Sequence, residues 1–275
     1  MEFLDDRERW LALPHAPRRI ISLVPSITET LFALGAGKRV VGVTTYCTHP
    51  IDSVAGITKV GGTKDPDLEA IEKLEPDLVI VNDEENRHKD FSALEERGLP
   101  LYVTTPRTVL EGIRMVAQLG RLVGCQEQGH TLSRGLEQQY GEVTGGLRHL
   151  PRLRVFCPIW RKPWMSFNSD TYSDNMLWCC GGENLLRTKD DRYFSLGLDE
   201  VAAADPQVVL LPSEPYPFAK KHFVHLKSLL ETPAGQAGHF YCVDGMALCW
   251  YGPRIADGLT KLSRLFAFVR ETIHD

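Results

Sequence analysis

The chain has 275 residues, of which 43% are hydrophobic and 24% charged, and its formal net charge is −5. This length is enough for two cores of ordinary domain size. The sequence has no basic tract and no stretch approaching the roughly 18 apolar residues that span a membrane. We therefore expect neither a nucleic-acid partner nor a membrane-spanning segment.

In the first half, short apolar strands alternate with helical segments. Strands are expected at 19–24, 39–43, 77–81 and 99–104, and helices at 28–34, after Asp65-Pro66-Asp67 and at 91–97. Gly35 and Gly98 follow two of these helices, as helix-ending glycines do. Such alternation predicts a parallel sheet covered by helices.

The segment from 108 to 147 reads differently. It contains no convincing strand and no proline, and Val109, Ile113, Val116 and Leu119 recur at helical spacing. Glycines at 120, 124, 129 and 135 lower helix propensity. A single long helix is nevertheless the simplest prediction.

The second half repeats the pattern of the first. Strands are expected at 154–159, 208–211 and 240–243, and helices at 172–180, 198–204, 222–230 and 253–270. The fold class that follows is α/β, with two similar three-layer lobes built on central parallel sheets and joined by one long helix. The predicted boundaries are 1–106 for the N-terminal lobe, 107–150 for the connecting helix and 151–275 for the C-terminal lobe.

One internal repeat supports the two lobes directly. Residues 68–81 read LEAIEKLEPDLVIV, and residues 198–211 read LDEVAAADPQVVLL. Each copy has an acid after its first leucine (Glu69, Asp199) and a proline seven positions later (Pro76, Pro206) before an apolar strand. A duplicated unit of this kind predicts two lobes that face each other across a cleft.

Aromatic residues concentrate in the expected loops. The segment 160–167 reads WRKPWMSF, and Tyr46, Tyr193 and Trp250 lie in other loops. Loops at the carboxyl ends of parallel strands gather at one edge, where ligands bind. The aromatic residues would either line a broad apolar cleft for a flat ligand or fill the ends of the lobes. As a set they favour the ligand.

Charged and ligating residues give weaker signals. Glu69 and Asp199 would either interact favourably with the dipoles of their helices or bind basic residues of a two-fold partner. Arg254 could donate to a ligand or cap a loop. His222 and His225 could bind a metal, although their position beside two lysines is more typical of a solvated surface. We predict no metal site, and the absence of GxSxG, HExxH, Walker and GxGxxG motifs predicts that the chain is not an enzyme.

The seven cysteines bear on localisation. They are Cys47, Cys125, Cys157, Cys179, Cys180, Cys242 and Cys249. The number is odd and no CxxC occurs, which predicts buried thiols in a reducing compartment rather than disulfides. The N-terminal residues also lack the pattern of a secretory signal. We expect a cytoplasmic protein, or alternatively an extracytoplasmic one whose signal has been removed.

Three blocks resemble a known family. RIISLVPSITETLFALGAGKRVVGVTTYCTHP, LEAIEKLEPDLVIV and WRKPWMSFNSDTYSDNMLWCCGGENLL are similar to the cobalamin- and iron-chelate-binding proteins of ABC importers. The resemblance extends from about Arg19 to the last helix and is strongest to the vitamin B12 binders. It implies a helical-backbone protein of the periplasmic-binding-protein class, with no intrinsic cofactor. A corrinoid would bind between the lobes. The chain would be a monomer that is either the substrate-binding component of an ABC importer, with the permease as its partner, or a cytosolic relative of such a component.

The resemblance also implies roles for particular residues. Ser26, Tyr46 and Asn82 fall at first-lobe ligand contacts, and Trp164, Tyr193, Trp250 and Arg254 at second-lobe contacts. Glu69 and Asp199 fall where carboxylates dock the lobes onto permease arginines. On this basis Trp164→Ala should weaken ligand binding more than about tenfold and leave the fold intact.

Two other functions stay open. The chain could bind an iron siderophore or haem, with a side chain such as Tyr46 as an iron ligand. It could also be an enzyme or metal-site protein on the same scaffold, with His49 and Cys47 as titratable groups.

Overall fold

The computed structural model describes residues 1–274, which form two compact units. The first contains Met1–Pro106, Leu110–Glu137 and Tyr251–Pro253. The second contains Arg107–Val109, Gln138–Trp250 and the chain from Arg254 onward. Within residues 1–274, no helix has the length and apolar character needed to cross a membrane.

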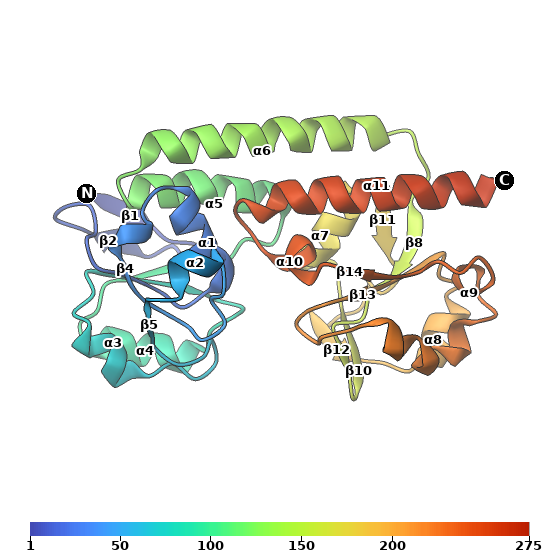
Figure 1. The fold of residues 1–275 in the computed structure, drawn as a ribbon, viewed down its shortest axis with the longest axis horizontal. Helices are drawn as coiled ribbons and strands as arrows, with labels where there is room; N and C mark the ends of the chain where they lie inside the picture. The colour runs from blue at the N-terminus through green and yellow to red at the C-terminus, as the bar shows by residue number, and fades with distance from the viewer. Residues whose placement is uncertain (275) are drawn as a thin grey trace. The chain divides into compact units, whose positions relative to one another are not determined.

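The first unit is built on a five-stranded parallel sheet (Figure 1). Its strand order is β5 (Thr58–Lys59), β4 (Val40–Val43), β3 (Ile20–Ser22), β6 (Leu78–Asn82) and β7 (Leu101–Thr104). All residues of β3, β6 and β7 are buried, as expected of strands covered on both faces. An antiparallel hairpin of β1 (Glu2–Leu4) and β2 (Trp10–Ala12), which the sequence did not predict, precedes the sheet.

Helices cover both faces of this sheet. On one face, α3 (Leu68–Lys73) and α4 (His88–Glu96) contribute Ile71, Phe91 and Leu94 to a core with residues of β3, β6 and β7. On the other lie α1 (Pro25–Ala33) and α5 (Val109–Leu122). The short α2 (Ile51–Val54) and η1 (Gly37–Arg39) flank β4 in the chain.

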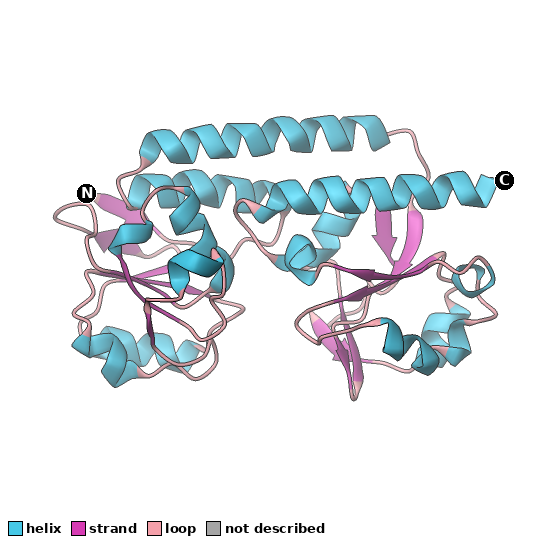
Figure 2. Ribbon diagram, in the orientation of Figure 1, coloured by secondary structure: helices cyan, strands magenta, loops and turns pink. Residues whose placement is uncertain are grey.

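The second unit has a similar four-stranded parallel sheet (Figure 2). Its order is β11 (Gly182–Asn184), β8 (Leu153–Phe156), β13 (Val208–Pro212) and β14 (Phe240–Val243). One face packs against α8 (Leu198–Ala203), η3 (Lys227–Leu229) and α9 (Pro233–Gln236) around Phe156, Val201 and Leu229. On the other face lie α7 (Tyr172–Cys179), α10 (Gly245–Cys249) and α11 (Arg254–His274). These sheets confirm the predicted α/β class.

The predicted long helix is divided in two. α5 ends before Gly124, which has φ +69°, and α6 (Gln126–Leu147) then continues from the first unit into the second. Gly120 and Gly129 lie where the two helices cross, because a Cβ added at Gly120 would lie 2.8 Å from the Gly129 Cα. The glycines therefore end one helix and allow a close crossing, and the connecting helix is shorter than 107–150.

The internal repeat is reproduced in detail. After α3 and α8, Glu75 and Asp205 adopt positive φ values of 42° and 48°. Arg19 donates its guanidinium to the C-cap carbonyl of Leu74, and Arg154 does the same to that of Ala204.

The residue after the proline of each copy makes a further equivalent bond. The Asp77 carboxylate accepts the backbone N–H of Arg19, and the Gln207 amide oxygen accepts that of Arg154. The two copies therefore fix their helix-to-strand turns by the same bonds.

Two segments of the second unit differ from the prediction. Residues 160–167 are not an irregular loop but form β9 (Trp160–Arg161) and β10 (Trp164–Phe167), which pair in an antiparallel sheet with β12 (Tyr193–Ser195). Residues 222–230 are not one helix, because two short 3₁₀ helices, η2 (Lys220–His225) and η3, replace it. The His222 ring accepts the Ala219 backbone N–H at 2.9 Å and so fixes the tight first turn.

Candidate functional site

The predicted first-unit contacts all follow neighbouring parallel strands. Ser26 comes after β3, Tyr46 after β4, and Asn82 ends β6. Since β4, β3 and β6 are adjacent, these positions belong to the same carboxyl edge of the sheet.

Ser26 and Tyr46 differ in what they can offer a ligand. Tyr46 is 62% exposed, so its phenol ring is open to solvent. Ser26 is buried in the first turn of α1, and its hydroxyl has no hydrogen-bond partner among the described residues. α1 also lacks a side-chain cap, because Val24 occupies the N-cap position.

Asn82 has a structural role that the sequence did not reveal. It is fully buried, and its Oδ1 accepts the backbone N–H groups of Glu84 and Glu85 at 2.9 and 3.0 Å. Its Nδ2 donates to Thr104 Oγ1 at 3.3 Å, and its backbone N–H donates to Asn86 Oδ1. These bonds occupy the side chain of Asn82 in holding the loop after β6, so a ligand contact from it would require them to break.

In the second unit, Trp164 and Tyr193 lie on the antiparallel sheet of β9, β10 and β12. Trp164 is partly buried and stacks on Phe218, with ring centroids 5.9 Å apart and planes inclined by 4°. Tyr193 is 42% exposed, and the Arg192 guanidinium lies 5.8 Å from its ring centroid. Trp164 thus has one ring face in the core of the unit, whereas Tyr193 is open to solvent.

Trp250 and Arg254 lie next to each other at the start of α11. The Arg254 guanidinium is 5.8 Å from the Trp250 ring centroid and pairs with Asp257 at 3.7 Å. Trp250 is only 7% exposed, and its indole N–H donates to the Glu214 carboxylate. Burial raises the pKa of Glu214. Glu214 therefore holds the Trp250 ring in place.

Sequence reasoning did not single out three residues at this edge: Glu214, Tyr216 and Phe218. All three follow β13 within a few residues, and Trp160, part of the predicted aromatic segment, follows β8. The signal that could have found them is this position, directly after predicted parallel strands. Only the structure shows that the residues after β8 and those after β13 meet.

The two repeat acids are alike in their surroundings. Glu69 and Asp199 are exposed in the first turns of α3 and α8. The structure gives neither an ion-pair partner among residues 1–274, whereas Glu72 pairs with Arg97 and Glu200 with Lys189. Each lobe thus has one unpaired acid at an equivalent position.

Cys47, which the alternative enzyme or metal site would use, lies in a buried environment. Cys47 is buried, with its Sγ 3.1 Å from the hydroxyls of Thr28 and Thr44, and burial raises the pKa of its thiol. Within residues 1–274, no three His, Cys, Asp or Glu side chains are grouped as metal ligands.

The structure agrees in part with the prediction that the cysteines are buried thiols. All seven cysteines are free, and four of them are buried, whereas Cys242 is exposed.

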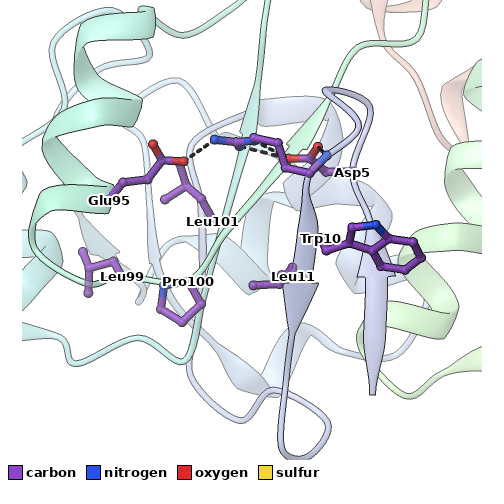
Figure 3. Close-up of a pocket in the computed structure, with 8 residues that line it drawn as sticks. Asp5, Trp10, Leu11, Glu95, Leu99, Pro100 and Leu101 are labelled. Carbon is purple, nitrogen blue, oxygen red and sulfur yellow. Dashed lines mark hydrogen bonds and ion pairs between the residues drawn. The ribbon is translucent and has the colours of Figure 1, made fainter.

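One open pocket of about 300 Å³ lies in the first unit, away from the predicted contacts (Figure 3). β2, the end of α4 and the start of β7 line it. Arg9 is held there between the carboxylates of Asp5 and Glu95. None of the predicted ligand contacts lines this pocket, and its opposite charges are already paired with each other.

Known proteins resemble the chain over nearly its whole length. It is 25% identical over 257 residues to the vitamin B12-binding protein of Vibrio parahaemolyticus, covering 92% of this chain and 90% of the relative. The corresponding protein of Vibrio campbellii is 27% identical over 260 residues, covering 92% and 91%.

Solved structures share the fold. The periplasmic vitamin B12 binding protein BtuF of Vibrio cholerae matches with a TM-score of 0.83 and 21% identity, covering 94% of this chain and 99% of that one. The periplasmic heme-binding protein RhuT of Roseiflexus sp. RS-1 matches with a TM-score of 0.81 and 24% identity, covering 92% and 98%.

A family model gives the same classification. The periplasmic binding protein family matches residues 20–246, which include both sheets and all the predicted contacts except Trp250 and Arg254. The relatives are substrate-binding proteins and not enzymes. The chain belongs to the periplasmic binding protein family, as a substrate-binding protein of the vitamin B12 and iron-chelate type.

Proposed function

We propose that the chain binds a corrinoid, a cobalamin-like ligand, as the substrate-binding component of an ABC importer. The observation that carries this proposal is the similarity to vitamin B12-binding proteins over nine-tenths of both chains. The aromatic residues at the carboxyl edges of both sheets fit such a ligand, because flat apolar rings bury well against aromatic faces.

Both units contribute contacts in this proposal. Tyr46 and Tyr193 offer exposed rings, and the free face of Trp164 is backed by Phe218. The buried Ser26 hydroxyl would gain a partner in a ligand amide, since an unpaired buried hydroxyl costs about 1–3 kcal/mol. Rings already held by Phe218 and Glu214 need little ordering on binding.

Single-residue variants test the aromatic contacts. Trp fluorescence is followed during titration with cyanocobalamin for the native protein, Tyr46→Ala and Tyr193→Ala. Each variant should bind at least about fivefold more weakly, because a stacking face is lost. Trp10→Ala is the matched control, since Trp10 is 71% exposed on the N-terminal hairpin, outside the predicted contacts. Unchanged affinity in both tyrosine variants would contradict the proposed contacts.

A second candidate ligand is haem, which the exposed Tyr46 phenol favours as an oxygen ligand for iron. Hemin titrated into the native protein would then give a shifted Soret band. Tyr46→Phe keeps the ring and removes the ligating oxygen, so it should abolish the shift. A hemin spectrum identical in both proteins would exclude Tyr46 as an iron ligand.

We further propose that Glu69 and Asp199 dock the protein onto arginines of an ABC permease. Their support is their equivalent position in the repeat and their exposure without an ion pair. Glu69→Gln with Asp199→Asn should leave cyanocobalamin affinity unchanged and reduce cobalamin uptake by cells at least about tenfold. The control, Glu72→Gln with Glu200→Gln, changes acids of the same helices that are already paired. Equal uptake by both double variants would refute the docking role.

Delivery to an importer requires the protein outside the cytoplasmic membrane. We therefore propose the extracytoplasmic alternative, to which the periplasmic family gives support. Fractionation of the native host, with the chain detected by antibody, tests it. Recovery in the cytosolic fraction alone would contradict the importer role and leave corrinoid binding untouched.

A further inference from the structure

The second unit contains a cluster of five rings, Trp160, Trp164, Tyr216, Phe218 and His222, which we call the ring cluster. Neighbouring ring centroids lie 4.6 to 5.9 Å apart. Phe218 and His222 are buried, whereas Trp160 is 42% exposed and Trp164 and Tyr216 are partly exposed. The cluster is therefore anchored in the core and opens to solvent on its tryptophan side.

Three cations border this cluster: Arg161, Lys162 and Lys221, which we call the basic rim. Arg161 is the last residue of β9 and pairs across the hairpin with Trp164, Lys162 lies in the turn to β10, and Lys221 adjoins His222. None of the three has an ion-pair partner in the part of the chain that the structure describes. By contrast, Lys189 and Lys261 of the same unit pair with Glu200 and Asp244.

The rim acts on the histidines from two sides. Burial, and then the charges of Lys221 and Arg161, lower the pKa of His222. Burial, and then Arg161 and Lys162, lower the pKa of His225. Arg161 lies opposite Trp164 in the β9–β10 hairpin, and the His222 and His225 rings lie 6.3 Å apart, so the hairpin and η2 both place positive charge beside these rings.

The hydrogen bond at His222 fixes what this ring can donate. The backbone N–H of Ala219 can only donate, so Nδ1 of His222 is an acceptor and carries no proton. A neutral ring then carries its proton on Nε2. In this tautomer Nε2 donates a hydrogen bond and does not ligate a metal. This hydrogen bond argues against His222 as a metal ligand through Nε2, the alternative that the sequence left open.

We propose that the basic rim and the His222 Nε2–H form a subsite for carboxylate or phosphate groups at the edge of a ring ligand that lies on the ring cluster. Trp164, a proposed ligand contact, is only two residues from Lys162, so the subsite deepens the proposed function and rests on it. Positive charge beside flat apolar rings complements a flat ligand with an anionic edge. The chain would thus prefer a corrin with free carboxylates to one whose side chains are amidated.

Two probes separate this inference from the proposed function. Cyanocobalamin, with amidated side chains, tests corrinoid binding. Cobyrinic acid, a corrin with free carboxylates, tests the subsite. Calorimetry at low salt should show cobyrinic acid binding about tenfold tighter than cyanocobalamin, with the preference lost at about 0.5 M salt as charges are screened. Arg161→Gln with Lys162→Gln should abolish the preference and leave cyanocobalamin affinity within about twofold.

Lys220→Gln is the matched control. Lys220 adjoins Lys221 in η2 and lies near Cys242 of β14, whose thiol pKa burial raises and the Lys220 charge lowers. This variant should keep the preference. Equal binding of both corrins by the native protein would overturn the subsite alone. Inorganic phosphate binding as tightly as cobyrinic acid would also overturn it, because the rings would then contribute nothing.

Failure of both corrins would refute the proposed function instead. The subsite is then tested with hemin, whose propionates supply the same carboxylates. Weaker hemin binding by the Arg161→Gln, Lys162→Gln variant than by Lys220→Gln would support it, and equal binding would overturn it.

Discussion

At the scale of single residues, the predicted ligand contacts differ in whether their side chains are exposed. Tyr46 and Tyr193 are exposed, as a ligand contact requires. Asn82 and Trp250, chosen by the same resemblance, are buried and held by Thr104 and Glu214. Sequence position shows which strand a residue follows. It does not show whether neighbouring loops already use its polar atoms.

Trp164→Ala should weaken cyanocobalamin binding more than about tenfold, because the ring loses its contact with the ligand. The structure changes the expectation for stability, since Trp164 also stacks on Phe218. We expect the free energy of unfolding in urea to fall by about 1–3 kcal/mol. Trp164→Phe should restore most of that stability. A Trp164→Ala protein of native stability would show that the stacking contributes nothing.

Asn82→Ala tests the role that the structure assigns to Asn82. Removing the amide leaves the backbone N–H groups of Glu84 and Glu85 without their acceptor. The free energy of unfolding should fall by about 2–3 kcal/mol. Tyr46→Ala, at an exposed position of the same sheet edge, should change it by less than about 0.5 kcal/mol. Equal stability of the two variants would argue against a structural role.

At the scale of elements, the duplicated segments predicted the fold because each copy encodes a complete local unit. The sequence places the helix, the turn and the strand of 68–81 and 198–211 correctly, and the bonds made by Arg19 and Arg154 repeat as well. The prediction of one long helix over 108–147 was wrong, because the helix break depends on tertiary contact. Helical spacing predicts a helix, but the crossing at Gly120 and Gly129 becomes visible only when two helices pack.

The hairpin at 160–167 shows the same limit. The sequence analysis placed this aromatic-rich segment in a loop. Pairing of β10 with β12, some 30 residues later in the chain, instead makes a sheet. Such pairing between distant segments has no local signature.

Glycine substitutions in α6 test the helix crossing. Gly129→Val places a branched side chain against Gly120, whose Cα lies 3.0 Å from the added Cβ. We expect a loss of about 2–4 kcal/mol in the free energy of unfolding. Gly135→Ala, in the same helix, has nothing within 4 Å of its added Cβ and should stabilise by about 0.5–1 kcal/mol. An unchanged free energy of unfolding in Gly129→Val would disprove the close crossing.

At the scale of the whole molecule, two similar units present aromatic residues from equivalent sheet edges and an exposed acid, Glu69 or Asp199, at the same position of the repeat. This duplication was evident in the sequence. The identity of the ligand was harder to predict from the sequence, because ligand binding depends on which rings remain exposed and which charges remain unpaired. Arg161 and Lys162 appear in the sequence only as part of a mixed loop. The structure places Arg161 opposite Trp164 of the ring cluster, with Lys162 next to it in the turn.

The most direct test of corrinoid binding is a calorimetric titration of the purified native protein with cyanocobalamin. The account predicts one site per chain with a dissociation constant in the micromolar range or below, about −8 kcal/mol or more favourable. Absence of heat and of fluorescence change at high micromolar concentration would contradict it. The scaffold would then serve another ligand.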